Sequence, residues 1–157
     1  MGQSTDGELA FLTIEEAAPR LASGDLSPVE LTKAVLERVG KAELLGATYI
    51  DVLTESALAE AKGAEAVIAA GNYRGMLHDI PVGVKAVFAV TGLVNHAGSR
   101  AWSPPAATED AEVVRRLRAA GAVVLGTHHL YEFAMGATAA NPHFGTLPNP
   151  WGQDRVP

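Results

Sequence analysis

The sequence predicts an α/β fold in which helices flank a mixed sheet. Two runs rich in β-branched residues, at 82–88 and 122–125, have the apolar character of buried strands. Residues 110–121 lie between them and have the periodicity of an amphipathic helix. A strand, a helix and a second strand in this order are typical of a right-handed crossover within one sheet. With 157 residues, 48% of them hydrophobic, the chain can enclose a core.

The first helices are predicted from their starting signals. Residues 1–12 are expected to form a flexible leader. Thr13-Ile14-Glu15-Glu16 fits a capping box, in which the first residue caps the helix and the fourth reaches back; Gly24 should end this region. Ser27-Pro28-Val29-Glu30 combines an N-cap serine, a proline at the first helical position and a glutamate at the third. A second helix should therefore run from here to about residue 44, with an apolar face of Leu31, Val35 and Val39.

A strand and a third helix are predicted next. Residues 48–53 read as a short strand. Thr54 can cap the helix that follows, and Gly71-Asn72 should close it. The apolar stripe of this helix would comprise Ala57, Ala61, Ala64 and Ile68.

The second half of the chain is predicted to contain long irregular segments. Residues 92–105 are rich in Gly, Ser and Pro, which favours a loop. Asp110 can cap the crossover helix, whose inner face would comprise Val113, Leu117 and Ala120. Residues 126–136 lead out of the second buried strand, and from Thr138 onward prolines interrupt any periodicity.

Composition excludes several classes of function. The formal net charge is −6 without a long run of like charge, so no direct nucleic-acid binding and no membrane binding are expected. The chain has no cysteine, which excludes disulfides and zinc–thiolate sites. No stretch has the apolar length of a membrane span, and the N-terminus lacks a signal-peptide pattern. A soluble cytoplasmic protein is therefore expected. Phosphate-binding glycine motifs are absent from the sequence, which disfavours a nucleotide-binding domain.

Lys85 lies inside the apolar run 80–90 and is the leading candidate for a functional residue. Burial of an ammonium group favours the neutral amine, which can act as a base. The alternative is a lysine at a sheet edge whose amine reaches water. The histidines offer no comparable signal, because the adjacent His128 and His129 would point to opposite faces of a strand and cannot chelate one metal ion.

The segment Tyr131-Glu132-Phe133-Ala134-Met135-Gly136 allows two interpretations. Phe133 and Met135 could pack into the core from a loop. Alternatively, the segment could form a wall facing a substrate, with backbone groups exposed at Gly136. The sequence of the segment alone leaves both open.

Six segments, read in order from residue 77, match motifs of one enzyme family. They are Leu77-His78-Asp79-Ile80-Pro81-Val82-Gly83-Val84-Lys85, Ala97-Gly98-Ser99, residues 110–123, Glu132-Phe133-Ala134-Met135-Gly136, Asn149-Pro150-Trp151 and Asp154-Arg155-Val156-Pro157. The first is similar to a lysine strand of pattern L-x-G-I-P-V-x-V-K, and the second to a T-x-G-S loop. Together they resemble the amidase signature family of serine amidohydrolases, over roughly residues 12–157.

The resemblance implies a role for Lys85 as general base. In that family a neutral lysine takes a proton from a serine that is preceded by a cis peptide bond, and this serine takes one from the nucleophilic serine. The nucleophile then forms an acyl-enzyme with the amide substrate. Phe133, Met135 and Gly136 are expected to line the substrate pocket. No metal and no cofactor are expected.

The resemblance also predicts which part of the enzyme this chain represents. The family's glycine-serine loop follows its D-R-x-P motif, which here ends at Pro157. Residues 13–157 are therefore expected to be the N-terminal portion of a single amidase domain, truncated before the catalytic loop. The chain alone is expected to be inactive, with the C-terminal remainder and a small-molecule amide as its partners. The identity of the amide stays open, as does a homodimer.

A departure from the family pattern leaves an alternative open. The family usually has Asp directly after its lysine, where this chain has Ala86, and Ala89 stands at a second such position. The missing carboxylate is compatible with a more strongly lowered pKa of Lys85, and equally with a degenerate site. The alternative is a non-catalytic interaction or scaffold module that retains the amidase fold.

Overall fold

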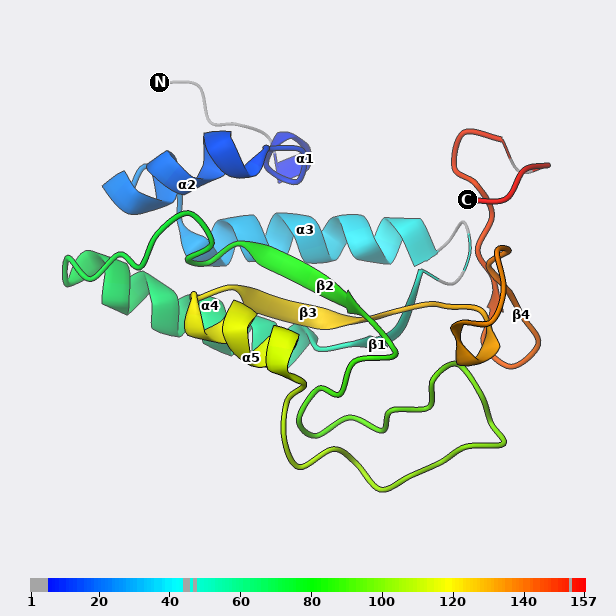
Figure 1. Cartoon of the computed structure of the whole chain (residues 1–157). Helices are drawn as coiled ribbons and strands as arrows, with labels where there is room; N and C mark the ends of the chain where they lie inside the picture. Colours follow the sequence, from blue (N-terminus) through cyan, green and yellow to red (C-terminus); the bar gives the residue numbers. More distant parts are fainter. Residues whose placement is uncertain (1–5, 44–45, 47, 153) are drawn as a thin grey trace. The chain divides into compact units, whose positions relative to one another are not determined.

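The computed structural model describes residues 6–43, 46, 48–152 and 154–157, and its described part combines helices with a three-stranded sheet (Figure 1). The chain divides into two compact units. Of the described residues, the first contains 6–38, 53–82 and 116–125, and the second contains 39–43, 46, 48–52, 83–115, 126–152 and 154–157.

The first unit is built on three N-terminal helices, α1 (Asp6–Leu9), α2 (Ile14–Ser23) and α3 (Pro28–Glu43), of which α3 continues into the second unit. Its main apolar cluster contains Leu9, Ala17, Leu21, Leu26, Leu31, Ala34 and Ile80. Leu9 is 6% exposed within this cluster. The expected leader was therefore drawn too long, since residues from α1 onward belong to the folded unit; residues 1–5 lie outside the described part.

The predicted helix starts are confirmed at α2 and α3. The backbone N–H of Thr13 donates to Glu16 at 2.8 Å, and the N–H of Glu16 donates back to the Thr13 hydroxyl at 3.3 Å. Gly24 closes α2 in the left-handed region, with φ of 78°. The Ser27 hydroxyl accepts from the N–H groups of Val29 and Glu30, as an N-cap does. These signals are local, which is why the sequence was sufficient.

The third long helix, α4 (Thr54–Ala69), differs from the prediction at its start. Its N-cap is Leu53, so Thr54 is the first helical residue and not the cap. The N–H of Leu53 donates to the Leu125 carbonyl at 2.7 Å, so a neighbouring strand fixes this helix start. The predicted stripe is confirmed at Ala57 and Ala61, which are fully buried.

The sheet has the order β1-β3-β2, with β1 at Tyr49–Val52, β2 at Pro81–Lys85 and β3 at Val123–His128. β1 pairs antiparallel with β3. Between β2 and β3, Val123 N donates to Ile80 O at 3.0 Å and Ala86 N donates to His128 O at 3.2 Å. These bonds advance in the same direction along both strands, so this pair is parallel. The predicted mixed sheet is confirmed.

The crossover between the parallel strands contains α5 (Glu112–Ala119), and its buried face differs from the prediction. Val114 is fully buried, whereas Val113 is 41% exposed. Of the expected face, Val113 is wrong, whereas Leu117 and Ala120 are partly buried. Asp110, expected as the cap of this helix, accepts hydrogen bonds from the N–H and the hydroxyl of Thr91.

The second unit is dominated by irregular chain. No helix or strand lies between Lys85 and Glu112, and this irregular stretch includes the loop predicted for residues 92–105. A short antiparallel pair, β4 (Ala140–Asn141) and β5 (Gly145–Thr146), lies near the end of the chain. None of the helices in the described part combines the length and apolarity needed to cross a lipid bilayer.

Candidate functional site

The carboxyl ends of β2 and β3 lie at the same edge of the sheet because the two strands are parallel. β2 ends at Lys85, and the hydrogen bond from Ala86 N to His128 O joins the two strand ends. Lys85 and the segment that follows His128 therefore leave the sheet at one edge. This is the edge at which open α/β sheets carry their sites.

Lys85 is exposed, which corrects the expectation of a buried amine. In β2 the buried residue is Val84, and the strand ends at Lys85 instead of continuing to residue 88. The apolar run misled the prediction because three of its residues turn away from the sheet after Lys85. Within the described residues, Lys85 forms no ion pair, so no carboxylate holds its amine.

Two rings cover the backbone of β2 next to Lys85. His128 and Tyr49 meet edge to face, with ring centroids 4.6 Å apart. Burial lowers the pKa of His128, so its imidazole is neutral at pH 7. Burial, followed by the charge of Glu43, raises the pKa of the Tyr49 hydroxyl. Both rings are therefore uncharged at pH 7.

The segment 131–136 forms one 3-10 turn, Glu132–Ala134, with unusual backbone angles. Phe133 and Ala134 have φ of 52° and 57°, in the left-handed region that non-glycine residues seldom occupy. Phe133 is 49% exposed and Met135 is 83% exposed. The interpretation in which both side chains pack into the core is therefore wrong. At Gly136, a Cβ would lie 2.5 Å from the Tyr131 ring, so this ring packs directly on the glycine backbone.

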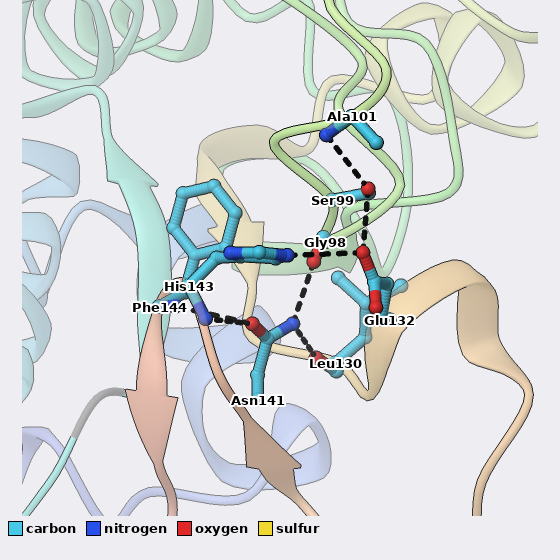
Figure 2. Close-up of polar contacts among 8 residues, drawn as sticks. All are labelled: Gly98, Ser99, Ala101, Leu130, Glu132, Asn141, His143 and Phe144. Atoms are coloured by element: carbon cyan, nitrogen blue, oxygen red, sulfur yellow. Dashed lines mark hydrogen bonds and ion pairs between the residues drawn. The ribbon is translucent and has the colours of Figure 1, made fainter.

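A buried serine and a histidine share the Glu132 carboxylate. The Ser99 hydroxyl, fully buried, donates to Glu132 Oε1 at 2.6 Å, and His143 Nε2 lies 3.1 Å from the same oxygen (Figure 2). Because an ionised carboxylate accepts and cannot donate, His143 carries its hydrogen on Nε2. The hydrogen bond from Ser99, and then that from His143, lower the pKa of Glu132 below its ordinary value.

Asn141 connects three loops from below this cluster (Figure 2). It is 4% exposed, and its amide nitrogen donates to Gly98 O at 2.7 Å and to Leu130 O at 2.9 Å. Its amide oxygen accepts from the backbone N–H groups of His143 and Phe144, at 2.8 and 3.1 Å. One side chain thus fixes the loop at 98, the exit of β3 and the turn between β4 and β5.

The sequence motifs contained these residues but did not reveal their roles. Ser99 and Glu132 lie in two matched motifs 33 residues apart, and no local pattern indicates that they touch. Asn141 and His143 lie in a stretch without periodicity. The available signal was Gly98, whose φ of 70° marks a loop of special geometry.

The cluster is not a nucleophilic triad. Ser99 Oγ donates to a carboxylate instead of to a histidine, and no part of Ser99 reaches solvent. Nor do any three His, Asp or Glu side chains of residues 6–43, 46, 48–152 and 154–157 converge as metal ligands would. The arrangement is suited to holding loops in place at the sheet edge where Lys85 lies.

Comparisons with known proteins identify relatives along nearly the whole chain. The family model described as Amidase matches residues 30–157. A glutamyl-tRNA(Gln) amidotransferase subunit of Salinispora arenicola is 40% identical over 153 residues, which cover 96% of this chain and 30% of that protein. The corresponding subunit of Acinetobacter baylyi is 38% identical over 150 residues with the same coverage. The chain therefore spans about 30% of the length of these curated relatives.

Solved structures give the same result for the fold. The native peptide amidase of Stenotrophomonas maltophilia has a TM-score of 0.83 and 30% identity, covering 93% of this chain and 31% of that chain. A protein from a vestigial complex related to the origins of an s-triazine catabolic enzyme has a TM-score of 0.88 and 34% identity, covering 92% and 32%.

Proposed function

The chain belongs to the Amidase family, and we propose on this basis that it is the N-terminal portion of an enzyme that cleaves a carboxamide through a serine acyl-enzyme. Lys85 is the general base in this proposal. The observation that carries the assignment is the position of Lys85 at the carboxyl end of β2, beside the exit of β3, without an ion-pair partner among the described residues.

The proposed chemistry uses Lys85 and two serines. The neutral amine removes a proton from a bridging serine, which removes the proton of the nucleophilic serine. The nucleophile bonds to the amide carbonyl carbon, the C–N bond breaks, and the leaving amine takes up the proton through the same relay. Water or another amine then releases the acyl group. In this proposal both serines lie in the portion of the enzyme that this chain does not span, since the chain covers 30% of the Salinispora arenicola subunit.

Exposure of Lys85 places a requirement on the proposal. An amine in water stays protonated at neutral pH, so a base needs a less polar environment. In the proposed enzyme, the additional polypeptide covers Lys85 and supplies that environment. The uncharged rings of His128 and Tyr49 and the apolar side chains of Phe133 and Met135 support such a covered site.

Exposure of Lys85 and the substitution at Ala86 also favour a second candidate, a non-catalytic interaction module with the amidase fold. The residue after the lysine carries no carboxylate, and Ala86 is 6% exposed. A module of this kind would need no amine at this position. The two candidates differ in one outcome, the recovery of amide cleavage when the missing portion is supplied.

The test is a chimera in which residues 1–157 replace the matching part of the Salinispora arenicola protein. Release of ammonia from glutamine and from a C-terminal peptide amide is measured, and unfolding by urea verifies that each variant folds. We expect turnover by the chimera and none by the 157-residue chain alone.

Three variants of the chimera separate the roles of the lysine. Lys85→Ala removes the amine, and Lys85→Arg keeps a positive charge that cannot be removed near neutral pH. Both are expected to lower kcat by at least about 100-fold. Lys62→Ala, on the exposed face of α4, is the matched control and should leave kcat unchanged. A folded chimera without turnover, or a Lys85→Ala variant with normal turnover, would contradict the proposal.

A further inference from the structure

The segment that carries Phe133 and Met135 adopts a backbone that is costly by itself. Left-handed angles are disfavoured at non-glycine residues because the Cβ crowds the backbone, and two consecutive residues, Phe133 and Ala134, have them. The result is that two large apolar side chains are held toward solvent. Neither feature favours folding, so other contacts must hold this conformation.

Backbone hydrogen bonds provide the first contact. Phe133 N donates to the carbonyl of Ala97 at 2.7 Å, and Ala97 is itself left-handed, with φ of 49°. Ala134 N donates to Tyr131 O at 2.7 Å, and Met135 N donates to Glu132 O at 3.2 Å. The bond from Phe133 to Ala97 persists only while the loop at 97 keeps its position relative to the segment, whereas the other two bonds lie within the segment.

The Glu132 carboxylate provides the second contact. It lies one residue before the left-handed pair and joins Ser99, two residues after Ala97, to His143 in the β4–β5 turn (Figure 2). The Ser99 hydroxyl also accepts from Ala101 N at 3.0 Å, so it is held from both sides. Through Ser99, the carboxylate holds the segment 131–136 against the loop that contains Ala97, as the bond between Phe133 and Ala97 requires. Through His143, it also ties the segment to the β4–β5 turn.

We propose that Glu132 is a positioning residue of the substrate pocket: through Ser99 and His143 it holds the segment 131–136 so that Phe133 and Met135 form the apolar wall against the substrate. The inference rests on the proposed function for the identity of what the wall contacts. The positioning itself is a property of this chain and can be measured without catalysis.

Hydrogen exchange of the 157-residue chain is the first test. Glu132→Ala is expected to increase exchange at the amides of Phe133, Ala134 and Met135 by about tenfold, since loss of the hydrogen bonds to Glu132 makes local opening of the segment easier. Glu132→Gln keeps an acceptor oxygen for Ser99 and should retain most of the protection. Glu109→Ala, at an exposed glutamate of the same unit, is the control. Unchanged exchange in Glu132→Ala overturns the positioning role.

Kinetics of the chimera described above are the second test. With Glu132→Ala we expect KM for amides with an apolar acyl group to rise roughly 10- to 100-fold, with a smaller change in kcat. Phe133→Ala should raise the same KM, and Glu132→Gln should restore it. An equal loss in kcat for all amides, or a KM unaffected by Phe133→Ala, overturns the assignment of the wall to the substrate. If the wild-type chimera has no turnover, the proposed function fails, and the exchange measurement still decides whether Glu132 positions the segment.

Discussion

Gly83 and the imidazole of His128 lie so close together that no side chain fits between them. A Cβ built on Gly83 would be 2.1 Å from His128 Nε2 and 2.7 Å from the Tyr49 hydroxyl, closer than any side chain tolerates. The rings of His128 and Tyr49 therefore pack against the backbone of Gly83, two residues before Lys85. Glycine at this position is therefore required by the packing of β1 and β3 and not by the backbone angles of β2.

Replacement of Gly83 by alanine should displace the His128 ring. We expect a loss of about 1–3 kcal/mol in the free energy of unfolding, as for an overpacked core, measured by urea titration. The displaced imidazole regains water, so the pKa of His128 should rise toward its ordinary value, as observed by NMR. Gly63→Ala, where no atom lies within 4 Å of the added Cβ, is the control. It should stabilise α4 by about 0.5–1 kcal/mol. Equal stability of both variants would contradict the packing explanation.

Asp79 should make the stability of the first unit depend on pH. Its side chain is fully buried, and neither carboxylate oxygen has a hydrogen-bond partner in the part of the chain that the structure describes. Burial, followed by the charges of Glu65 and Glu60, raises the pKa of Asp79 to about 8. The folded state therefore holds a proton that the unfolded chain releases above the ordinary aspartate pKa of 3.8. Stability should fall as pH rises from about 4 to 8.

Two variants of Asp79 test this dependence. Asp79→Asn removes the charge and retains a residue that tolerates the φ of 64°. Asp79→Gly removes both the charge and the backbone cost. Each is expected to raise the free energy of unfolding at pH 8 by about 1–3 kcal/mol, with less effect at pH 4. Glu109→Gln serves as the exposed control. A wild-type chain equally stable at both pH values would contradict the assignment.

Replacement of Asn141 should lower the free energy of unfolding, because this one side chain holds three loops of the second unit. All its amide hydrogen-bonding capacity is directed to backbone groups of three loops. Asn141→Ala leaves those groups unsatisfied, with an expected cost of about 1–3 kcal/mol. Asn141→Asp should be at least as harmful, because a carboxylate would face the carbonyls of Gly98 and Leu130. Urea unfolding measures both. Asn72→Ala, at an exposed position, should change the free energy of unfolding little. A loss as large as that of Asn141→Ala would contradict the explanation by the hydrogen bonds of Asn141.

Substitution of Lys85 should leave the stability of the chain unchanged. The side chain is exposed and forms no ion pair with any described residue. Lys85→Ala and Lys85→Arg should therefore change the free energy of unfolding by less than about 0.5 kcal/mol. The measurement is urea unfolding of the 157-residue chain. A larger loss would mean that Lys85 stabilises the fold, and any loss of turnover in its variants could no longer be ascribed to chemistry.

The accuracy of the sequence predictions followed the range of the interactions involved. The starts of α2 and α3 were predicted because the capping groups lie within three residues of one another. The start of α4 was missed because a hydrogen bond to Leu125, distant in sequence, sets it. The burial of Lys85 was wrong for a related reason. An apolar run indicates that its residues are buried on average. Whether Lys85 is buried depends instead on where β2 ends, which is set by where its pairing with β3 stops.

The amino-acid sequence by itself determined the α/β class, the mixed sheet, the helix caps at Thr13 and Ser27, and the family, because these depend on local patterns and ordered motifs. The tertiary structure alone decided that Lys85 is exposed, that Phe133 and Met135 face solvent, and that Glu132 joins Ser99 to His143. The Glu132 contacts depend on loops 11 to 33 residues apart that meet in space. A hydrogen bond between side chains leaves no periodic trace in the sequence, so only the folded chain reveals it.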